Sequence, residues 1–324
     1  MNSDRIEELA REPAPTGSER RKTALILSGG GARGAYEVGV FKALKEHGVI
    51  FDLVIGTSIG AINAACIAQD DFERWEQMWC RIRSADVFHP LSLRRLTQLL
   101  RGQCKGILDN SPLEQLLRKE LDLEKIKLSR TIVGWCMTDL CTQETSLATA
   151  DMMADFDELI DTLMATSAVP LAFPPRTVAG AGLYIDGGLV RNTPMKFALE
   201  LGIQEIYAVL LNSNAPETPP AHFMEYFDRV MDVMFDCSAR NAIAFAHFYN
   251  GVLARNATGV SDAALRLHVL RPRKPMRTKL LGFDPKQTVQ LIADGYEDTV
   301  HHLLKDDCAE CQGSFEEVAS ARWF

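Results

Sequence analysis

One serine stands in a sequence context that is typical of a catalytic nucleophile. Gly56, Thr57, Ser58, Ile59 and Gly60 fit the pattern G-x-S-x-G, a strand-to-helix turn that exposes a serine hydroxyl. An apolar run precedes this turn and an alanine-rich segment follows it, as the turn requires. A serine hydroxyl at neutral pH also needs a neighbouring base to take its proton. The pattern predicts a nucleophile, although a helix N-cap explains Ser58 equally well on its own.

A cluster of glycines lies upstream of this serine. Gly29, Gly30, Gly31 and Gly34 fall between an apolar run and a helical segment. Glycines let backbone N–H groups approach a ligand closely at a helix N-terminus, where the helix dipole favours negative charge. Those are the requirements of an oxyanion hole. A tight turn with close helix packing explains one or two of these glycines, but not four.

The same glycines also fit G-x-G-x-x-G, the phosphate-binding pattern of dinucleotide-binding proteins. That pattern needs an acidic residue near the end of the second strand, where it holds the ribose. Here the second strand ends in Gly56, and Asp52 stands at its start. We therefore expect neither a nucleotide nor another cofactor at this site.

No histidine is well placed to act as the base for Ser58. A Ser–Asp–His triad needs a histidine in a loop just beyond a strand, and no later histidine stands in such a loop. Asp186 occupies a turn of that kind, because strand-like residues 183–185 lead to it and Gly187 and Gly188 follow. Two glycines free the backbone to aim the carboxylate. The rejected histidines are His89, His222, His247, His268, His301 and His302.

Three motifs together resemble the patatin-like phospholipases, a family of serine lipid hydrolases with a Ser–Asp dyad. GGGARG at residues 29–34, GTSIG at 56–60 and DGG at 186–188 stand complete and in this order. Secondary matches are ATSAVPLAFPP at 165–175 and GGLVRNTP directly after the aspartate. The resemblance is best over residues 23–211 and looser in the remainder.

The resemblance implies a role for each motif. Ser58 is the expected nucleophile and Asp186 the expected proton acceptor. The implied chemistry is acyl transfer from a phospholipid or lysophospholipid through an acyl-enzyme, without a metal. The residues implied around the oxyanion are Gly29, Gly30, Gly31, Arg33 and Gly34.

The same dyad would also serve a thioesterase, a neutral-lipid esterase or a transacylase. A non-catalytic lipid-binding module is a further alternative, against which the intact Ser58 and Asp186 argue. An ordinary aspartate, with a pKa of about 3.9, is a weak base for a hydroxyl. We therefore expect burial to raise the pKa of Asp186, and the helix N-terminus to favour the alkoxide of Ser58.

Strand-like and helix-like segments alternate, which predicts a mainly parallel sheet in a three-layer α/β/α fold. Strands are expected at Thr23–Ser28 and Leu53–Ile55, and helices at Gly34–Glu46 and Ile59–Ala68. If the two strands are parallel neighbours, the glycine cluster and the serine lie at one carboxyl edge, where α/β sites are found. Residues 71–127 are expected to form a helical cap insertion.

The expected domain spans residues 22–304. A flexible tail is expected over residues 1–21, and a second tail over residues 305–324. The second tail carries Cys308 and Cys311 in a single CxxC. A structural zinc site normally needs a second pair of ligands at similar spacing, so we expect no metal there.

The composition is that of an ordinary globular protein, with 324 residues of which 47% are hydrophobic. The net charge of −8 argues against a nucleic-acid partner, because phosphate contacts need clustered Lys and Arg. The N-terminal residues carry charges throughout, unlike a secretory signal peptide. No uncharged run reaches the roughly 20 apolar residues of a membrane span. A cytoplasmic location is the default expectation.

Two segments are candidates for contact with lipid. Residues 91–101 form a short, basic, amphipathic segment that would suit an anionic membrane surface, although packing of its leucines on the core is the commoner arrangement. Residues 222–253 carry a stripe of Met and aromatic side chains, for which a core position is again commoner than an acyl groove. We expect a lipid ester substrate and, as a hypothesis, transient contact with a membrane surface.

Overall fold

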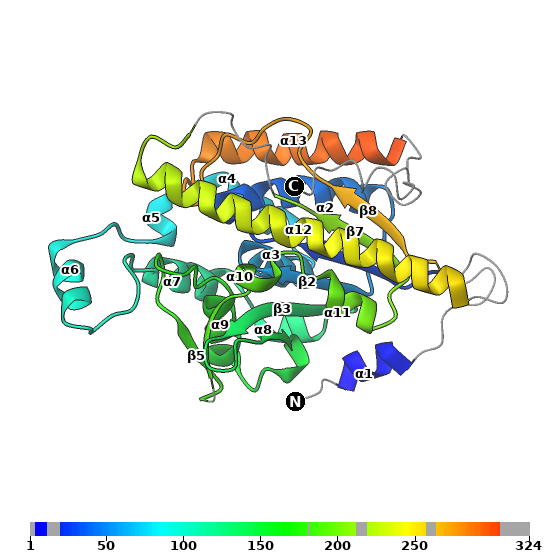
Figure 1. Ribbon diagram of the computed structural model, residues 1–324, viewed down its shortest axis with the longest axis horizontal. Helices are drawn as coiled ribbons and strands as arrows, with labels where there is room; N and C mark the ends of the chain where they lie inside the picture. The colour runs from blue at the N-terminus through cyan, green and yellow to red at the C-terminus, as the bar shows by residue number, and fades with distance from the viewer. Residues whose placement is uncertain (1–3, 12–19, 181, 212–218, 257–263, 305–324) are drawn as a thin grey trace.

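The structure is a computed structural model, which describes residues 4–11, 20–180, 182–211, 219–256 and 264–304. In this part of the chain a central sheet lies between two layers of helices (Figure 1). The predicted three-layer α/β/α fold is therefore confirmed. The CxxC of the C-terminal tail lies outside the described residues.

The described sheet has eight strands, and most of them are parallel. In chain order they are β1 (Thr23–Leu27), β2 (Leu53–Thr57), β3 (Ile132–Asp139), β4 (Thr145–Thr149), β5 (Arg176–Val178), β6 (Gly182–Asp186), β7 (Glu205–Val209) and β8 (Arg266–Leu270). Consecutive members of the series β5-β6-β3-β2-β1-β7-β8 are hydrogen-bonded to each other, and β4 also pairs with β3. The strands β3, β2, β1, β7 and β8 are parallel. The predicted neighbours β1 and β2 are thus present.

Thirteen α-helices are described, and a short 3₁₀ turn (Gly31–Gly34) links β1 to the helix that follows it. The helices are α1 (Asp4–Arg11), α2 (Ala35–Glu46), α3 (Ile59–Ala68), α4 (Phe72–Arg81), α5 (Ser84–Val87), α6 (Leu93–Leu100), α7 (Ser111–Glu120), α8 (Leu123–Lys127), α9 (Phe156–Thr166), α10 (Gly188–Arg191), α11 (Met195–Glu200), α12 (Phe223–Asn256) and α13 (Pro285–Leu304). None of the helices described has the combination of length and hydropathy that crossing a bilayer needs.

The central strand β1 supplies both halves of the core, because successive side chains of a strand point to opposite faces. Leu25 and Leu27 belong to the core cluster that includes residues of α2, α3, α4, α9 and α13. Ala24 and Ile26 belong to the cluster on the other face, with residues of α11 and α12. All five residues of β1 are buried, as expected for a strand covered on both faces.

Strands β2 and β6 meet end to end on the same side of β3. Strand β2 pairs with residues 132–136 of β3, β4 pairs with 134–138, and β6 pairs with 137–139. The overlaps place β4 on one side of β3 and both β2 and β6 on the other. Because β6 runs antiparallel to β3, its last residue, Asp186, arrives beside the carboxyl end of β2. This arrangement brings Asp186 close to Ser58, which directly follows β2.

The N-terminal segment differs from the expected flexible tail over residues 1–21. Asp4–Arg11 form helix α1, and Leu9 in it is buried in the second core cluster. Arg5 donates to the backbone oxygen of Ser129 at 2.9 Å, and Lys22 Nζ donates to the backbone oxygen of Leu9 at 2.6 Å. One buried leucine and two side chains that bind carbonyl oxygens connect this segment to the domain, and such long-range contacts are not apparent from the sequence.

The segment expected as a helical cap, residues 71–127, is not one separate unit. Trp79 of α4, Leu117 of α7 and Ile126 of α8 are almost fully buried in the main core cluster. Only α6 contributes no buried residue, and Figure 1 shows it standing apart at one end of the molecule. Most of the predicted insertion is therefore part of the helical layer, and α6 is its projecting piece.

Candidate active site

Ser58 occupies a sharp turn between β2 and α3. Its backbone has φ 56° and ψ −123°, a left-handed conformation that a residue other than glycine adopts only under constraint. The constraint includes a hydrogen bond from the Ser58 N–H to Oγ1 of Thr166, at 3.0 Å. This geometry agrees with the strand–turn–helix context that makes G-x-S-x-G a nucleophile elbow.

The glycines that flank Ser58 are required by close backbone contacts. A Cβ added to Gly56 would lie 2.1 Å from the carbonyl oxygen of Gly60. A Cβ added to Gly60 would lie 2.4 Å from the carbonyl oxygen of Leu27, in β1. Either side chain would push α3 away from the sheet. The two glycines of the elbow therefore hold the start of α3 against the end of β1.

Asp186 is buried, and its carboxyl lies beside the Ser58 hydroxyl. Its Oδ1 accepts a hydrogen bond from the Gly188 N–H at 2.7 Å. Burial raises the pKa of Asp186 to about 7, although the Ser58 hydroxyl and the Gly188 N–H act in the opposite direction. A Cβ added to Gly187 would lie 2.5 Å from the carbonyl oxygen of Cys136 in β3. The turn thus needs Gly187 so that it fits against the sheet.

The glycine loop after β1 places unpaired backbone donors next to Ser58. A Cβ added to Gly29 would lie 3.1 Å from Cβ of Ser58, and Gly31 lines the same cavity as Ser58. No described residue accepts a hydrogen bond from the N–H groups of Gly30, Gly31 or Ile59. Free N–H groups from a glycine loop and from the residue after the nucleophile are the components of an oxyanion hole.

Arg33, which the resemblance placed near the oxyanion, turns its side chain elsewhere. Its side chain is 4% exposed and forms an ion pair with Asp232 of α12, and its Nε donates to the backbone oxygen of Thr278 at 2.9 Å. Its backbone N–H donates to Gly30 within the 3₁₀ turn. Arg33 therefore ties the glycine loop to α12. Gly34 is needed for packing, because its Cβ would lie 2.5 Å from Ile59.

Two supporting residues were not singled out from the sequence. Asn192 donates from Nδ2 to the Gly29 carbonyl oxygen at 3.1 Å, while the Gly29 N–H donates to the Asn192 carbonyl oxygen at 3.4 Å. Thr166 holds the Ser58 N–H and donates in turn to the Cys136 carbonyl oxygen. Both lie within motifs already noted, ATSAVPLAFPP and GGLVRNTP. Spacing alone does not reveal such cross-links, because they depend on which strands are neighbours.

A second buried acid lies behind the glycine loop. Glu37 in α2 is fully buried, and burial raises its pKa well above the ordinary value. Its Oε2 accepts from Nδ2 of Asn63 at 2.7 Å, and the same amide donates to the Gly34 carbonyl oxygen. The Oδ1 of Asn63 accepts from the indole N–H groups of Trp75 and Trp79. This network joins the glycine turn to α3 and α4.

Ser58 opens into a small apolar cavity. The cavity has a volume of about 50 Å³, and no histidine lines it. The described walls of this cavity therefore contain no histidine that could act as the base of a Ser–Asp–His triad. His268 instead lies on β8, where it stacks on Tyr207 and contacts Glu205 at 3.0 Å. The lining includes Ile59, Ile62, Trp79, Leu117, Phe173 and Phe283.

Known proteins are similar in sequence to the segment that forms this site. A family model described as "Patatin-like phospholipase" matches residues 25–199. A cGAMP-activated phospholipase of Escherichia coli is 29% identical over 199 residues, which cover 55% of this chain and 55% of that protein. Lysophospholipase nte1 of Aspergillus terreus is 56% identical over 50 residues, which cover 15% of this chain and 3% of that protein.

The fold is similar to that of a solved structure, VipD from Legionella pneumophila. The structural alignment covers 89% of this chain and 67% of the VipD chain. Its sequence identity is 16% and its TM-score is 0.48. The chain spans about half the length of the bacterial relative named above and a far smaller share of the fungal one.

The matched family segment covers more than half of the chain and contains Ser58, Asp186 and the glycine loop. It begins in β1 and ends in α11, so it includes the strands that bring Ser58 and Asp186 together. The chain therefore belongs to the patatin-like phospholipase family.

Proposed function

We propose that this protein hydrolyses lipid esters, phospholipid or lysophospholipid, through a Ser58–Asp186 dyad and an acyl-enzyme. The observation that carries the proposal is a serine on a constrained elbow beside a buried carboxyl whose pKa is about 7. A base with a pKa near the working pH combines the correct protonation state with useful proton affinity. The apolar lining of the cavity supports an acyl chain as the bound group.

In the first half of the reaction, the Asp186 carboxylate takes the proton of Ser58 and Oγ bonds to the ester carbonyl carbon. The carbonyl electron pair moves to its oxygen, which the N–H groups of Gly30, Gly31 and Ile59 are positioned to hold. Collapse of this intermediate breaks the ester C–O bond, and the alcohol leaves with the proton from Asp186. An acyl-enzyme on Ser58 remains.

In the second half, water attacks the acyl carbon and gives a proton to Asp186. The second tetrahedral intermediate collapses, the bond to Ser58 Oγ breaks, and the proton returns to Ser58. The fatty acid leaves, and the enzyme regains its starting state. Since one carboxyl serves as base and then acid in each half, no imidazole is required.

Labelling with a fluorophosphonate probe tests the nucleophile. We expect labelling of the wild type and of Ser167→Ala, which removes another serine of the same cavity, but none of Ser58→Ala. Mass spectrometry of lipids incubated with the wild type is expected to show free fatty acid and the matching lysolipid or glycerophospho compound. Labelling of Ser58→Ala at the wild-type level would exclude the assigned nucleophile.

The other hypotheses for this dyad predict different products. A thioesterase would release fatty acid from acyl-thioesters faster than from phospholipid, a neutral-lipid esterase would prefer acylglycerols, and a transacylase would transfer the acyl group to an alcohol rather than to water. A non-catalytic lipid-binding module would show no probe labelling at all. Comparison of these substrates with one enzyme preparation distinguishes the four.

A further inference from the structure

Helix α6 leaves its apolar face exposed. None of its eight residues is buried, and Leu93 and Leu100 are 84% and 80% exposed. The leucines of residues 91–101 were expected to pack on the core, but the structure places them outside it. The helix keeps its position through Arg95, which donates to the carbonyl oxygens of Gly106 and Leu108 at 3.1 Å. A leucine-rich helix that is fixed but uncovered indicates a missing partner.

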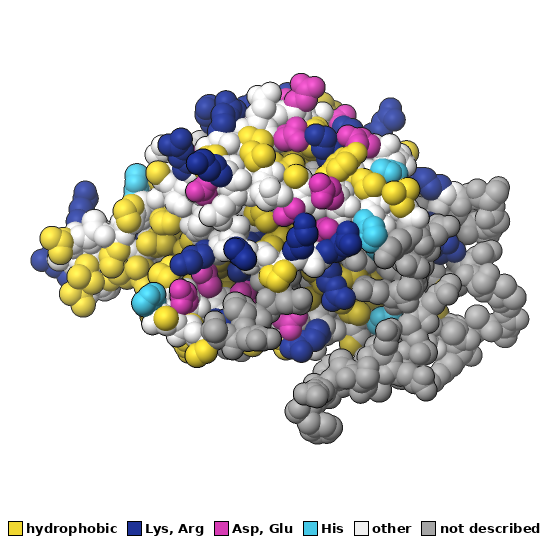
Figure 2. All heavy atoms as spheres, turned by 90° about the horizontal axis from the view of Figure 1, so that it is seen from above, with side chains coloured by type: hydrophobic (Ala, Val, Ile, Leu, Met, Phe, Trp, Pro, Cys, Tyr) yellow, Lys and Arg dark blue, Asp and Glu magenta, His cyan; other side chains and the backbone are white. Residues whose placement is uncertain are grey.

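Apolar side chains from other segments extend this exposed surface. Phe223 at the start of α12 is 68% exposed, and Leu171 is exposed in the loop after α9. The Met and aromatic stripe of α12 is therefore divided, because Met231 and Phe235 are buried as expected while Phe223 is not. Figure 2 shows hydrophobic side chains gathered at the end of the molecule where α6 projects, with Lys and Arg at its tip.

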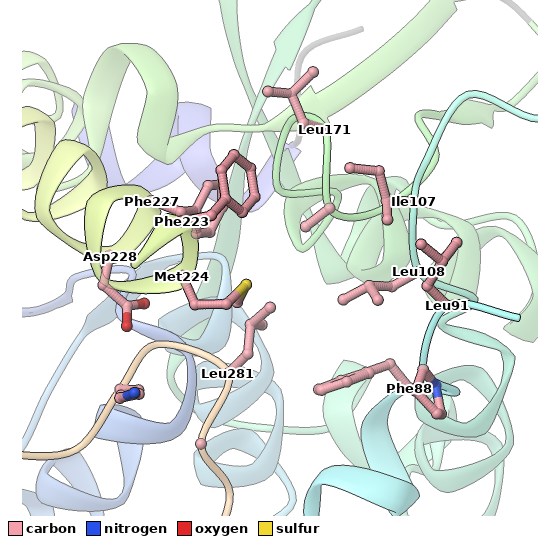
Figure 3. A pocket seen from close by; sticks show the side chains of 14 residues that line it. Phe88, Leu91, Ile107, Leu108, Leu171, Phe223, Met224, Phe227, Asp228 and Leu281 are labelled. Carbon is pink, nitrogen blue, oxygen red and sulfur yellow. The ribbon is translucent and has the colours of Figure 1, made fainter. Parts of the chain in front are cut away.

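A groove opens within this surface. It has a volume of about 380 Å³ and an almost entirely apolar lining. Figure 3 shows Phe223, Met224 and Phe227 of α12 on one wall and Phe88, Leu91 and Leu108 on the opposite wall. The volume falls within the range of ligand-binding pockets, roughly 300–1,000 Å³, whereas the cavity at Ser58 is much smaller.

The groove adjoins the cavity that contains Ser58. Leu281 lines both, and Phe173 of the Ser58 cavity directly follows Ala172 of the groove. Phe88 of the groove and Phe173 also pack ring against ring, with centroids 6.1 Å apart. An apolar ligand that enters at this exposed surface thus reaches the wall of the cavity at the nucleophile.

The exposed segment carries the opposite charge to the rest of the chain. Residues 87–108 contain four basic residues, Arg94, Arg95, Arg101 and Lys105, and no acidic residue, although the net charge of the chain is −8. Two acidic residues of α12, the helix on the opposite wall of the groove, bind backbone N–H groups of this chain. Glu225 accepts from the Ala221 N–H, and Asp228 accepts from the Leu280 N–H. Basic side chains that flank an apolar face are typical of helices that bind anionic lipid surfaces.

We propose that this surface inserts into the headgroup region of an anionic lipid bilayer, with the groove facing the acyl chains. We call it the lipid-docking end and define it by Leu91, Leu93, Leu96, Leu100, Leu171 and Phe223. The inference rests on the proposed function, because the continuity with the Ser58 cavity matters only if Ser58 acts on a lipid. It names the surface by which that site reaches its substrate.

A lipid surface suits the lipid-docking end better than a second copy of this chain. A symmetric dimer would place the same patch of each copy against the other. Arg94, Arg101 and Lys105 of one copy would then approach the same residues of its partner, and like charges at an interface are costly. Anionic headgroups satisfy those side chains instead, and the bilayer interior covers the leucines.

Vesicle flotation tests the proposal. The protein is used in the Ser58→Ala form so that the lipids stay intact, with vesicles of phosphatidylcholine alone or mixed equally with phosphatidylglycerol. We expect flotation mainly with the mixed vesicles and less of it at high salt. The double variant Leu93→Glu/Leu100→Glu is expected to lower the partition coefficient about tenfold or more.

A matched control lies at the other edge of the sheet. Leu128 and Ile50 are also strongly exposed, at 82% and 63%, but they precede β3 and β2 and so lie near the amino ends of these strands. The double variant Leu128→Glu/Ile50→Glu is expected to float like the parent protein. Equal loss in both double variants would show that added negative charge alone weakens binding, and would overturn the proposal.

Further measurements distinguish this proposal from failure of the proposed function and from a dimer interface. With Ser58 intact, hydrolysis of a soluble short-chain ester by Leu93→Glu/Leu100→Glu should equal that of the wild type, because neither leucine lines the Ser58 cavity. If no ester is cleaved by any form but flotation follows the expected pattern, the proposed function fails and the docking surface stands. If the parent protein forms a dimer in the absence of vesicles, and Leu93→Glu/Leu100→Glu dissociates that dimer, the surface binds a second copy of the chain instead.

Discussion

Helices α3 and α6 have opposite relations to the rest of the molecule. Every residue of α3 is buried, and it carries no charged side chain. Helix α6 has no buried residue and carries two arginines among its leucines. The first helix is held by the sheet and carries Ser58, the proposed nucleophile, at its start, whereas the leucines of α6 are left exposed by the described residues. The proposed catalytic serine and the proposed docking surface thus lie on helices with opposite burial.

The local sequences of the two helices reflect this difference. Helix α3 needs small residues, since a Cβ on Gly60 would strike the backbone of β1. Helix α6 tolerates large apolar side chains because the described part of the chain leaves Leu93 and Leu100 almost uncovered. Changes to α3 or its surroundings are therefore expected to affect catalysis and folding, and changes to α6 to affect neither.

The largest effect is expected at Asp186, the last residue of β6, which lies beside the start of α3. Asp186→Asn removes the only proton acceptor assigned to Ser58, so kcat on a soluble ester should fall about 10³-fold or more. The measurement is steady-state hydrolysis of a short-chain ester. Asp157→Asn, which changes an exposed acid of α9, serves as the control and should keep wild-type kcat. A wild-type rate for Asp186→Asn would contradict the dyad.

The next effect concerns the packing of α3. Gly60→Ala places a Cβ 2.4 Å from the Leu27 carbonyl oxygen, and we expect the free energy of unfolding to fall by about 3 kcal/mol. Urea unfolding measures it. In Gly251→Ala, where nothing lies within 4 Å of the added Cβ, stability should stay equal or rise by up to about 1 kcal/mol. Similar values for the two variants would remove the packing argument.

The pH dependence of activity and stability sharpens the role of Asp186. Below its pKa of about 7, kcat/KM should rise about tenfold per pH unit and then level off, because the carboxylate is the active form. Burial raises this pKa above that of the unfolded chain, so the neutral form stabilises the fold at low pH and its contribution is lost as pH rises through about 7.

Asp186→Asn removes that pH dependence of stability. Relative to the wild type, the variant should gain about 2 kcal/mol in free energy of unfolding between pH 5 and pH 8. Thermal or urea unfolding at the two pH values measures the difference. An equal pH dependence in both proteins would mean that Asp186 is not the group with the raised pKa.

The smallest effect is expected in α6. Leu93→Ser and Leu100→Ser should each change the free energy of unfolding by less than about 0.5 kcal/mol, because both side chains are already exposed. Ile67→Ala in α3, at 9% exposure, should cost at least about 2 kcal/mol by the same measurement. A large loss at Leu93 would mean that α6 packs on the core after all.

The sequence predicted the sheet and the three motifs of the candidate site because each depends on short-range signals. Apolar runs marked β1 and β2, and glycines marked the elbow around Ser58 and the turn after Asp186. The roles of Ser58 and Asp186 themselves stay predictions until activity is measured. The exposure of Leu93 was not predictable from its periodicity, because an amphipathic helix has the same pattern whether a core or an outside partner covers it.

Long-range contacts account for most of what the sequence missed. Arg33 stands in the glycine motif, yet its side chain pairs with Asp232, nearly two hundred residues later. Asn192 reaches Gly29 across a similar span. A single sequence gives the types of these residues but not the neighbours that the sheet order assigns to them.

The end-to-end meeting of β2 and β6 has a consequence for the newly made protein. Ser58 leaves the ribosome long before Asp186, and the two come together only when β6 pairs with the far half of β3. A nascent chain that has formed only β1 and β2 therefore holds Ser58 without the carboxyl that is proposed as its base. The proposed dyad is therefore complete only after residue 186 has been synthesised and β6 has paired with β3.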